Sequence, residues 1–167
     1  MRVDPDRGIF VCDYCGCEFA PPPEADGVLV VGPGKLSCSI CKTALSDGLL
    51  ESFSLEYCST CHGMLIAMDH LPLLIDAMRV RRERPSGYFV PRDSRDADRR
   101  LACPKCGAAM DGHPYGGGGN VNIDSCENCS LVWLDQGELR RIVMAPDHEP
   151  LYSDYEGREE RDERDPK

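Results

Sequence analysis

The stretch CPKCGAAMDGHPYGGGGNVNIDSCENC, residues 103–129, contains two C-x-x-C pairs that enclose 19 residues. A zinc ribbon needs two such pairs about 15 to 20 residues apart, because the hairpin between them then brings four sulfurs into a tetrahedron. The glycine run at residues 115–120 lacks the GK[ST] ending of a phosphate-binding loop and lies where this hairpin has to turn. The stretch therefore predicts a four-thiolate zinc site formed by Cys103, Cys106, Cys126 and Cys129.

A second copy of this pattern lies upstream, where two further C-x-x-C pairs enclose 16 residues. Residues 36–41, LSCSIC, align with residues 101–106, LACPKC, and residues 53–75 align with residues 121–143. Apolar residues alternate before the second pair of each copy, as in a strand, and recur at helical spacing after it. We therefore predict two tandem ribbon units, and a further zinc site formed by Cys38, Cys41, Cys58 and Cys61.

Each unit is expected to close its small core with a helix. In the first unit, four apolar residues have the i, i+3, i+4, i+7 spacing of one helix face: Leu71, Leu74, Ile75 and Met78. In the second, Asp135 and Glu138 have the spacing of a capping box. The apolar stripe that follows consists of Leu139, Ile142 and Val143. Trp133, the only tryptophan, is expected in the core rather than on a binding surface.

The composition favours metal as the source of stability. The chain has 167 residues and 11 cysteines, ten of which fall into five C-x-x-C pairs. A unit of about 45 residues buries too little surface to specify a fold without disulfides or metal. The predicted fold class is therefore small metal-stabilised α+β, with two zinc ribbons, each followed by a helix, and an N-terminal zinc knuckle.

The N-terminal residues contain no apolar run long enough for a secretory signal, and no window approaches the roughly 20 apolar residues of a membrane span. We therefore expect a cytoplasmic protein without a membrane partner. In that reducing compartment, regularly spaced cysteines are metal ligands more often than disulfide partners.

One pair, in YCSTCHG at residues 57–63, also has the C-x-x-C-H spacing of covalent haem attachment. The alignment of the two units places Ser130 where His62 stands, so the histidine is not part of the shared site. Haem attachment is moreover expected on the export side of a membrane. Zinc is therefore the better interpretation of this pair.

A fifth knuckle near the N-terminus consists of Cys12 and Cys15, followed by Cys17, the one cysteine outside a pair. Pairing this knuckle with residues 38–41 would leave residues 58–61 without a partner and break the repeat. We therefore predict a third, incomplete metal site, whose fourth position is open or filled by a histidine or by another chain. The alternatives are a structural, metal-free or dimer-bridging half-site.

The charge is unevenly distributed. The formal net charge of -10 repels polyanions, which disfavours nucleic acid as a partner of the whole surface. Residues 79–100 contain eight arginines against four acids, and Tyr88 and Phe89 could stack on bases there. We favour a solvated spacer for this segment and expect at most weak nucleic-acid binding through it.

These features divide the chain into five segments. They are an N-terminal knuckle segment (1–34), a first ribbon with its helix (35–84), an arginine-rich linker (85–100), a second ribbon with its helix (101–146) and an acidic tail (147–167). Only the two ribbon segments contain a full set of four cysteine ligands.

CPKCGAAM, residues 103–110, and IDSCENCSLVWLDQGELRRI, residues 123–142, together resemble the bacterial zinc-finger family named after the zinc ribbon of transcription initiation factor IIB. Its pattern is CPxCG, a hairpin, then CxxCGGxWLDxGEL and a helix. Beside the four cysteines, the matching residues are Trp133, Leu134, Asp135, Gly137, Glu138 and Leu139. The unit departs from the pattern where Ser130 and Leu131 replace its two glycines. The resemblance implies a zinc ribbon.

The first unit resembles the same pattern as a degenerate copy. Its four cysteines and Gly63 match. Its departures, at the positions of the tryptophan, the aspartate and a glycine, are Leu65, Ala67 and Asp69. The resemblance supports the fold and the metal of this unit but assigns no role to its altered signature.

The most consistent function is a zinc-binding interaction module, whose partner is a protein or, more weakly, a nucleic acid, with a connection to transcription suggested by the family name. The four histidines show no paired spacing such as HExxH, so we do not expect an enzyme. The alternative is a thiol- or zinc-dependent enzyme or redox protein that uses Cys12, Cys15 and Cys17.

Overall fold

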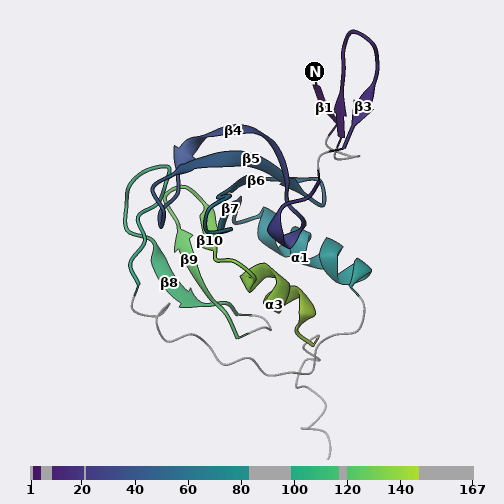
Figure 1. Cartoon of the computed structure of the whole chain (residues 1–167). Helices are drawn as coiled ribbons and strands as arrows, with labels where there is room; N and C mark the ends of the chain where they lie inside the picture. Colours follow the sequence, from purple (N-terminus) through teal and green to yellow (C-terminus); the bar gives the residue numbers. More distant parts are fainter. Residues whose placement is uncertain (1, 5–8, 21, 83–98, 117–119, 147–167) are drawn as a thin grey trace, which may run out of the picture.

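The computed structural model describes residues 2–4, 9–20, 22–82, 99–116 and 120–146. Within these residues the strands form two antiparallel sheets, and the smaller one lies at the N-terminus. Its strands are β1 (Arg2–Asp4), β2 (Ile9–Val11) and β3 (Glu18–Phe19). Figure 1 shows that this small sheet projects from the rest of the protein.

The main sheet has seven strands in the order β4-β5-β6-β7-β10-β9-β8, and all neighbours are antiparallel. The first half contributes β4 (Leu29–Ser37), β5 (Ala44–Leu50), β6 (Phe53–Tyr57) and β7 (Met64–Ala67). The second half contributes β8 (Asp111–Pro114), β9 (Asn122–Cys126) and β10 (Leu131–Leu134). The two halves therefore form one continuous sheet through β7 and β10.

The register at this junction places Trp133 of β10 opposite Leu65 of β7. These two residues also occupy the same position when residues 53–75 are aligned with residues 121–143. On either side of this pair, Met64 lies opposite Leu134 and Ile66 lies opposite Val132. In the alignment, Met64 corresponds to Val132 and Ile66 to Leu134, so exchanging the two units converts one cross-strand pair into the other. The junction is therefore approximately two-fold symmetric about the Leu65–Trp133 pair.

Alternation along β7 and β10 sends neighbouring side chains to opposite faces of the sheet. On one face, Met64, Ile66, Val132 and Leu134 belong to a core that includes the apolar residues of both helices. On the other face, Leu65 and Trp133 belong to a second core, which contains cysteines from four C-x-x-C pairs. The sheet thus separates a helix side from a cysteine side.

Two helices, α1 (His70–Arg81) and α3 (Glu138–Met144), lie next to each other on the helix side (Figure 1). Pro72 is tolerated in α1 because its first turn needs no backbone N–H donor. The buried residues of the two helices include Leu71, Leu74, Ile75, Leu139, Ile142 and Val143. Met78 is partly buried at the edge of the same core.

The division of the chain differs in one respect from that expected. Because β4 begins at Leu29 and pairs with β5, residues 29–34 belong to the main sheet rather than to the N-terminal segment. Residues 83–98, which include most of the arginine-rich linker, and the tail at 147–167 lie outside the described residues.

Candidate metal centres

Four of the five C-x-x-C knuckles share one backbone arrangement. In each, the N–H of the first cysteine donates to the carbonyl five residues later, at 2.7–2.9 Å. The N–H four residues after the first cysteine donates back to its carbonyl, at 2.7–3.1 Å. The first cysteines of these four knuckles are Cys12, Cys38, Cys58 and Cys103. Such a tight turn directs two thiols to one side.

The residue after the second cysteine has a positive φ in every knuckle. These residues, with φ between 52° and 74°, are Gly16, Lys42, His62, Gly107 and Ser130. His62 therefore occupies the left-handed position of a knuckle, and its Nδ1 lies 2.7 Å from the hydroxyl oxygen of Tyr57. The histidine of the C-x-x-C-H sequence thus has a structural place that the other knuckles fill with glycine, lysine or serine.

The first four-cysteine group consists of Cys38, Cys41, Cys58 and Cys61, whose Sγ atoms all lie within 4.8 Å of one another. The Sγ atoms of Cys38 and Cys61 are 3.7 Å apart. A zinc–sulfur bond of about 2.3 Å gives a tetrahedron edge of about 3.8 Å, whereas a disulfide bond is about 2.05 Å. All cysteines of the chain are free, and the spacing of this group fits zinc.

The second group consists of Cys103, Cys106, Cys126 and Cys129 and meets the same 4.8 Å limit. Here the Sγ atoms of Cys106 and Cys126 are 3.7 Å apart. Both groups predicted from the sequence are therefore brought together, and each consists of two knuckles facing each other. Among the described residues, no further cluster of at least three cysteine, histidine or carboxylate ligands meets this limit.

Hydrogen-bond donors lie close to the sulfurs of the first group. The N–H groups of Ile40 and Cys41 lie 3.3 and 3.2 Å from the Sγ of Cys38. Burial raises the pKa of Cys58, but hydrogen bonds from the Cys61 backbone and the Thr43 hydroxyl outweigh it and lower that pKa to about 6. Burial also raises the pKa of Cys61. Metal binding has to displace protons from the less acidic thiols, so zinc affinity increases with pH.

The second group has the same asymmetry. Hydrogen bonding by the Ala108 backbone is the main cause that lowers the pKa of Cys106 to about 7. The hydrogen bond with Cys106, together with burial, raises the pKa of Cys129 to about 12. The thiols within each site therefore differ in pKa.

Trp133 and Asp135 of the sequence signature support the cysteine side of the sheet. Trp133 is fully buried, and its indole N–H donates to the carboxylate of Asp135 at 2.9 Å. Arg99 lies 2.6 Å from Asp135 and 3.0 Å from Asp124, so it joins the β9 strand to the segment after β10. Trp133 is therefore in the core, and Asp135 orients it.

The GEL part of the signature starts helix α3. The backbone N–H of Asp135 donates to the Glu138 carboxylate at 2.8 Å, which is one half of the expected capping box. The Asp135 carboxylate bonds instead to Trp133 and Arg99. Among the described contacts, no side chain caps the start of α3. Gly137 precedes the helix with a φ of 78°, a conformation that favours glycine. The signature residues are thus structural.

Gly63 lies directly against Trp133. A Cβ atom at Gly63 would approach the Cζ2 atom of Trp133 to 2.3 Å and its Cε2 atom to 2.9 Å. The equivalent of Gly63 in the second unit is Leu131, which packs against the core that also contains Leu65. Leu131 thus replaces the glycine in the second unit, and Leu65 replaces the tryptophan in the first. Both replacements lie at the core on the cysteine side of the sheet.

We expect Gly63→Ala to destabilise the fold by about 1–3 kcal/mol, because overpacking forces neighbouring side chains or backbone to move. Urea unfolding followed by the fluorescence of Trp133 measures this loss. Gly32→Ala is the matched control, since a Cβ there has no neighbour within 4 Å. An unchanged midpoint for Gly63→Ala would contradict the contact.

The two metal groups share one apolar core. It contains the buried cysteines Cys38, Cys58, Cys103 and Cys126 together with Leu65 and Trp133. The hydroxyl of Ser39, in the first knuckle, donates at 2.6 Å to the carbonyl of Ala102, next to the second group. The folding of one site therefore supports the other.

The arginines at the start of the basic segment bind to the protein itself. Arg79 donates to the carbonyl of Ile142 at 3.1 Å, and Arg82 donates to the carbonyls of Val143 and Ala145 at 2.5 and 2.7 Å. These carbonyls lie at the C-terminal end of α3, where the helix provides no N–H donors for them. The arginines thus dock α1 onto α3, as the spacer interpretation allows.

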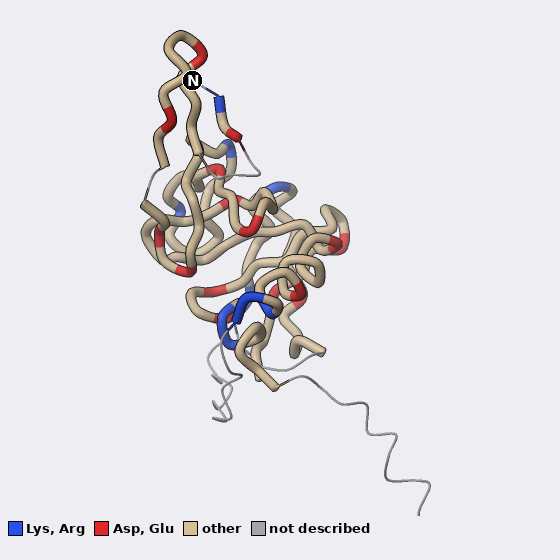
Figure 2. Tube along the Cα trace, turned by 90° about the vertical axis from the view of Figure 1, so that its right-hand side faces the viewer, with Lys and Arg blue, Asp and Glu red and all other residues tan. Residues whose placement is uncertain are grey.

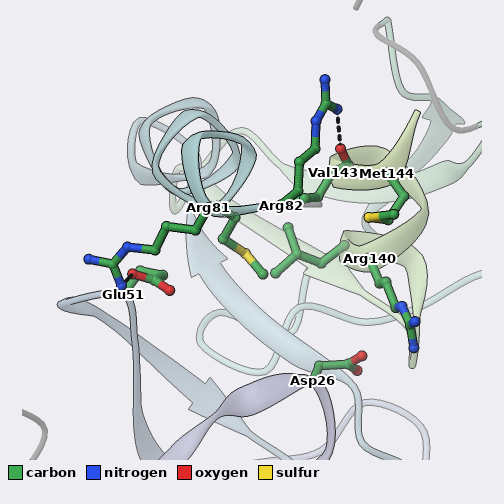
Figure 3. A pocket seen from close by; sticks show the side chains of 9 residues that line it. Asp26, Glu51, Arg81, Arg82, Arg140, Val143 and Met144 are labelled. Carbon is green, nitrogen blue, oxygen red and sulfur yellow. Dashed lines mark hydrogen bonds and ion pairs between the residues drawn. The ribbon is translucent and has the colours of Figure 1, made fainter. Parts of the chain in front are cut away.

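A cavity of about 410 Å³ lies between the ends of α1 and α3 and was not expected from the sequence. Its apolar residues are Met78, Leu139, Val143 and Met144, and its charged residues are Asp26, Glu51, Arg81, Arg82 and Arg140. Figure 3 shows that the arginines come from both helices. Arg81 pairs with Glu51 at 2.5 Å, whereas Arg140 is exposed. The cavity combines residues of both helices with Asp26 and Glu51, which are distant in the sequence, so no local sequence signal indicates it.

Residues 102–145 match a family model described as "Transcription factor zinc-finger". These residues include the four cysteines of the second group and α3. No curated protein and no solved structure matches the chain. Among the described residues, no helix has the length and hydrophobicity needed to cross a membrane.

The match supports a zinc-ribbon family for the second unit, and together with the two cysteine groups it indicates zinc binding. Residues 38–61 lie outside the matched region, so the tandem copy stays a prediction.

Proposed function

We propose that this chain is a tandem zinc-ribbon interaction module with two structural metals, and that it acts by binding a protein rather than by catalysis. The observation that carries the proposal is the donor set of both metal groups. Each provides four cysteine thiols, the closed set typical of structural zinc, whereas catalytic zinc keeps a position for water or substrate. The equivalence of Leu65 and Trp133 at the junction supports a degenerate first copy.

The cavity between α1 and α3 is the surface that best suits a partner. Its apolar lining includes Met78 and Met144, whose flexible side chains adapt to different partner surfaces. Its lining also includes the exposed Arg140 of α3, and arginine is enriched in the energetically important centres of interfaces. Among the described residues, Lys and Arg gather in the lower part of the body in Figure 2, whereas Asp and Glu are spread over it. A protein segment with an apolar anchor and an acidic flank fits this surface.

Arg140→Glu tests the cavity. The variant reverses one exposed charge on its rim and is expected to weaken partner binding at least tenfold, or about 1.4 kcal/mol. Partners captured from nuclease-treated lysate are identified by mass spectrometry, and their affinity is then measured with purified proteins. Because the matched family is described as a transcription factor zinc-finger, components of the transcription machinery are the first to test.

Lys35→Glu is the matched control, because it reverses an exposed charge on β4, away from the helices. The two variants should have the same zinc content and melting temperature as the wild type. Equal loss of binding in both, or full binding in both, would contradict the role of the cavity.

Nucleic acid is the weaker candidate. The net charge of -10 opposes a polyanion, and the described arginines Arg79, Arg81, Arg82 and Arg99 already bind groups of the protein. We expect weak binding that salt abolishes. A nanomolar complex with DNA or RNA that is insensitive to salt would overturn the proposal of a protein partner.

A further inference from the structure

The N-terminal knuckle has the backbone of a metal knuckle. The N–H of Cys12 donates to the carbonyl of Cys17 at 2.9 Å, and the N–H of Gly16 donates to the carbonyl of Cys12 at 2.8 Å. The φ of Gly16 is 70°. These features are those of the knuckles at residues 38–41, 58–61 and 103–106, each of which belongs to a four-cysteine group. Residues 12–15 are therefore organised to present two thiols.

This knuckle has no second knuckle on its own chain. Each four-cysteine group consists of two knuckles, and the two groups use all four of the others. Cys12 and Cys15 thus provide half of the ligands that a closed thiolate site needs.

Cys17 does not supply the missing half. It occupies the position that Thr43 and Gly63 hold in two other knuckles, five residues after the first cysteine, and neither is a ligand. The hydroxyl of Thr43 lies 3.6 Å from the Sγ of Cys58, so this position faces the metal-binding sulfurs as a hydrogen-bond partner. Cys17 likewise hydrogen-bonds to Cys15. Among the described residues, no group of three or more metal-ligating atoms within 4.8 Å of one another includes this knuckle.

The small sheet that carries the knuckle has little to stabilise it. Its strands contain three, three and two residues, and none of these residues is fully buried. The side chains of Tyr14 and Phe19 are 99% and 55% exposed. So short a sheet is marginal in water without further packing or a metal. It also projects from the protein, where a second molecule has access to it (Figure 1).

We propose that Cys12 and Cys15 from two copies of this chain bind one shared zinc ion and join the copies into a dimer. A second copy is the partner that necessarily carries an identical unpaired knuckle, and a two-fold axis through the zinc makes the two contributions equivalent. Four thiols lose their protons to give four zinc–sulfur bonds, and no electron transfer is involved. The exposed Tyr14 side chains then lie beside the shared site, where they gain packing.

Zinc content and molecular mass, measured on the same untagged sample under reducing conditions, test this arrangement. We expect about 2.5 zinc ions per chain and a dimer, because two closed sites and half of a shared site belong to each chain. The double variant Cys12→Ser/Cys15→Ser should contain about 2 zinc ions per chain and be a monomer. Its main unfolding transition should be unchanged, since the small sheet is separate from the seven-stranded sheet.

Cys17→Ser is the control, because serine retains a hydrogen-bond donor and the proposal gives Cys17 no bond to zinc. It should remain a dimer with about 2.5 zinc ions per chain. A wild-type monomer with about 2 zinc ions would show that the knuckle is empty, and this overturns the proposal. A wild-type monomer with about 3 zinc ions, falling to about 2 in Cys17→Ser, would show a three-thiolate site within one chain and also overturns it.

Discussion

Cys126→Ser is expected to release the zinc of both four-cysteine groups and to unfold the whole seven-stranded sheet. Cys126 is buried in the core that the two groups share, and its strand β9 pairs with β10. A structural zinc contributes on the order of 10 kcal/mol, which is comparable with the entire stability of a small domain. Because β10 is also the neighbour of β7, loss of the second ribbon exposes the edge of the first.

Elemental analysis and circular dichroism of the purified variant measure this effect. We expect the zinc content to fall close to that of an unfolded chain and the cooperative thermal transition to disappear. Cys17→Ser is the matched control, since that thiol is exposed and lies directly before β3, outside the seven-stranded sheet. A variant that keeps one zinc and a cooperative transition would show that the ribbons fold independently.

Trp133→Ala should destabilise the protein by about 3–5 kcal/mol, the range found for large aromatic residues in cores. Trp133 is fully buried opposite Leu65 and above Gly63, so its removal leaves a cavity between the two metal groups. The Asp135 carboxylate also loses the indole donor at 2.9 Å. Urea unfolding followed by circular dichroism measures the free energy, since the variant has no tryptophan.

Trp133→Phe separates packing from hydrogen bonding. It retains an aromatic ring in the core but lacks the N–H donor, so a smaller loss of about 1–3 kcal/mol is expected. Equal stability of Trp133→Ala and the wild type would contradict the placement of this residue at the centre of the core.

The cysteine groups could be predicted from the sequence because zinc ligation depends on local spacing. C-x-x-C fixes two thiols on one turn, and the enclosed lengths of 16 and 19 residues indicate which pairs meet. The alignment within the chain favours zinc over haem at residues 57–63, and His62 has the positive φ found at the equivalent position of every knuckle. Local chemistry of this kind is visible in one sequence.

The junction between the halves could not be predicted in this way. β7 and β10 are separated by more than 60 residues, and their pairing depends on both apolar faces at once. The same holds for the cavity between α1 and α3, whose lining brings together residues that are distant in the sequence. The small N-terminal sheet was missed because strands of two or three residues carry no periodic signal.

The Leu65–Trp133 register has a further consequence for the fidelity of folding. A slip of one residue between β7 and β10 would move the side chains of one strand to the opposite faces of the sheet, because side chains alternate between the faces. Trp133 would then meet the helices, and Val132 and Leu134 would face the thiols. Neither the helix side nor the cysteine side tolerates that exchange, so a misaligned intermediate is unstable on both faces at once. Correct alignment of β7 with β10 and correct filling of both cores therefore depend on each other.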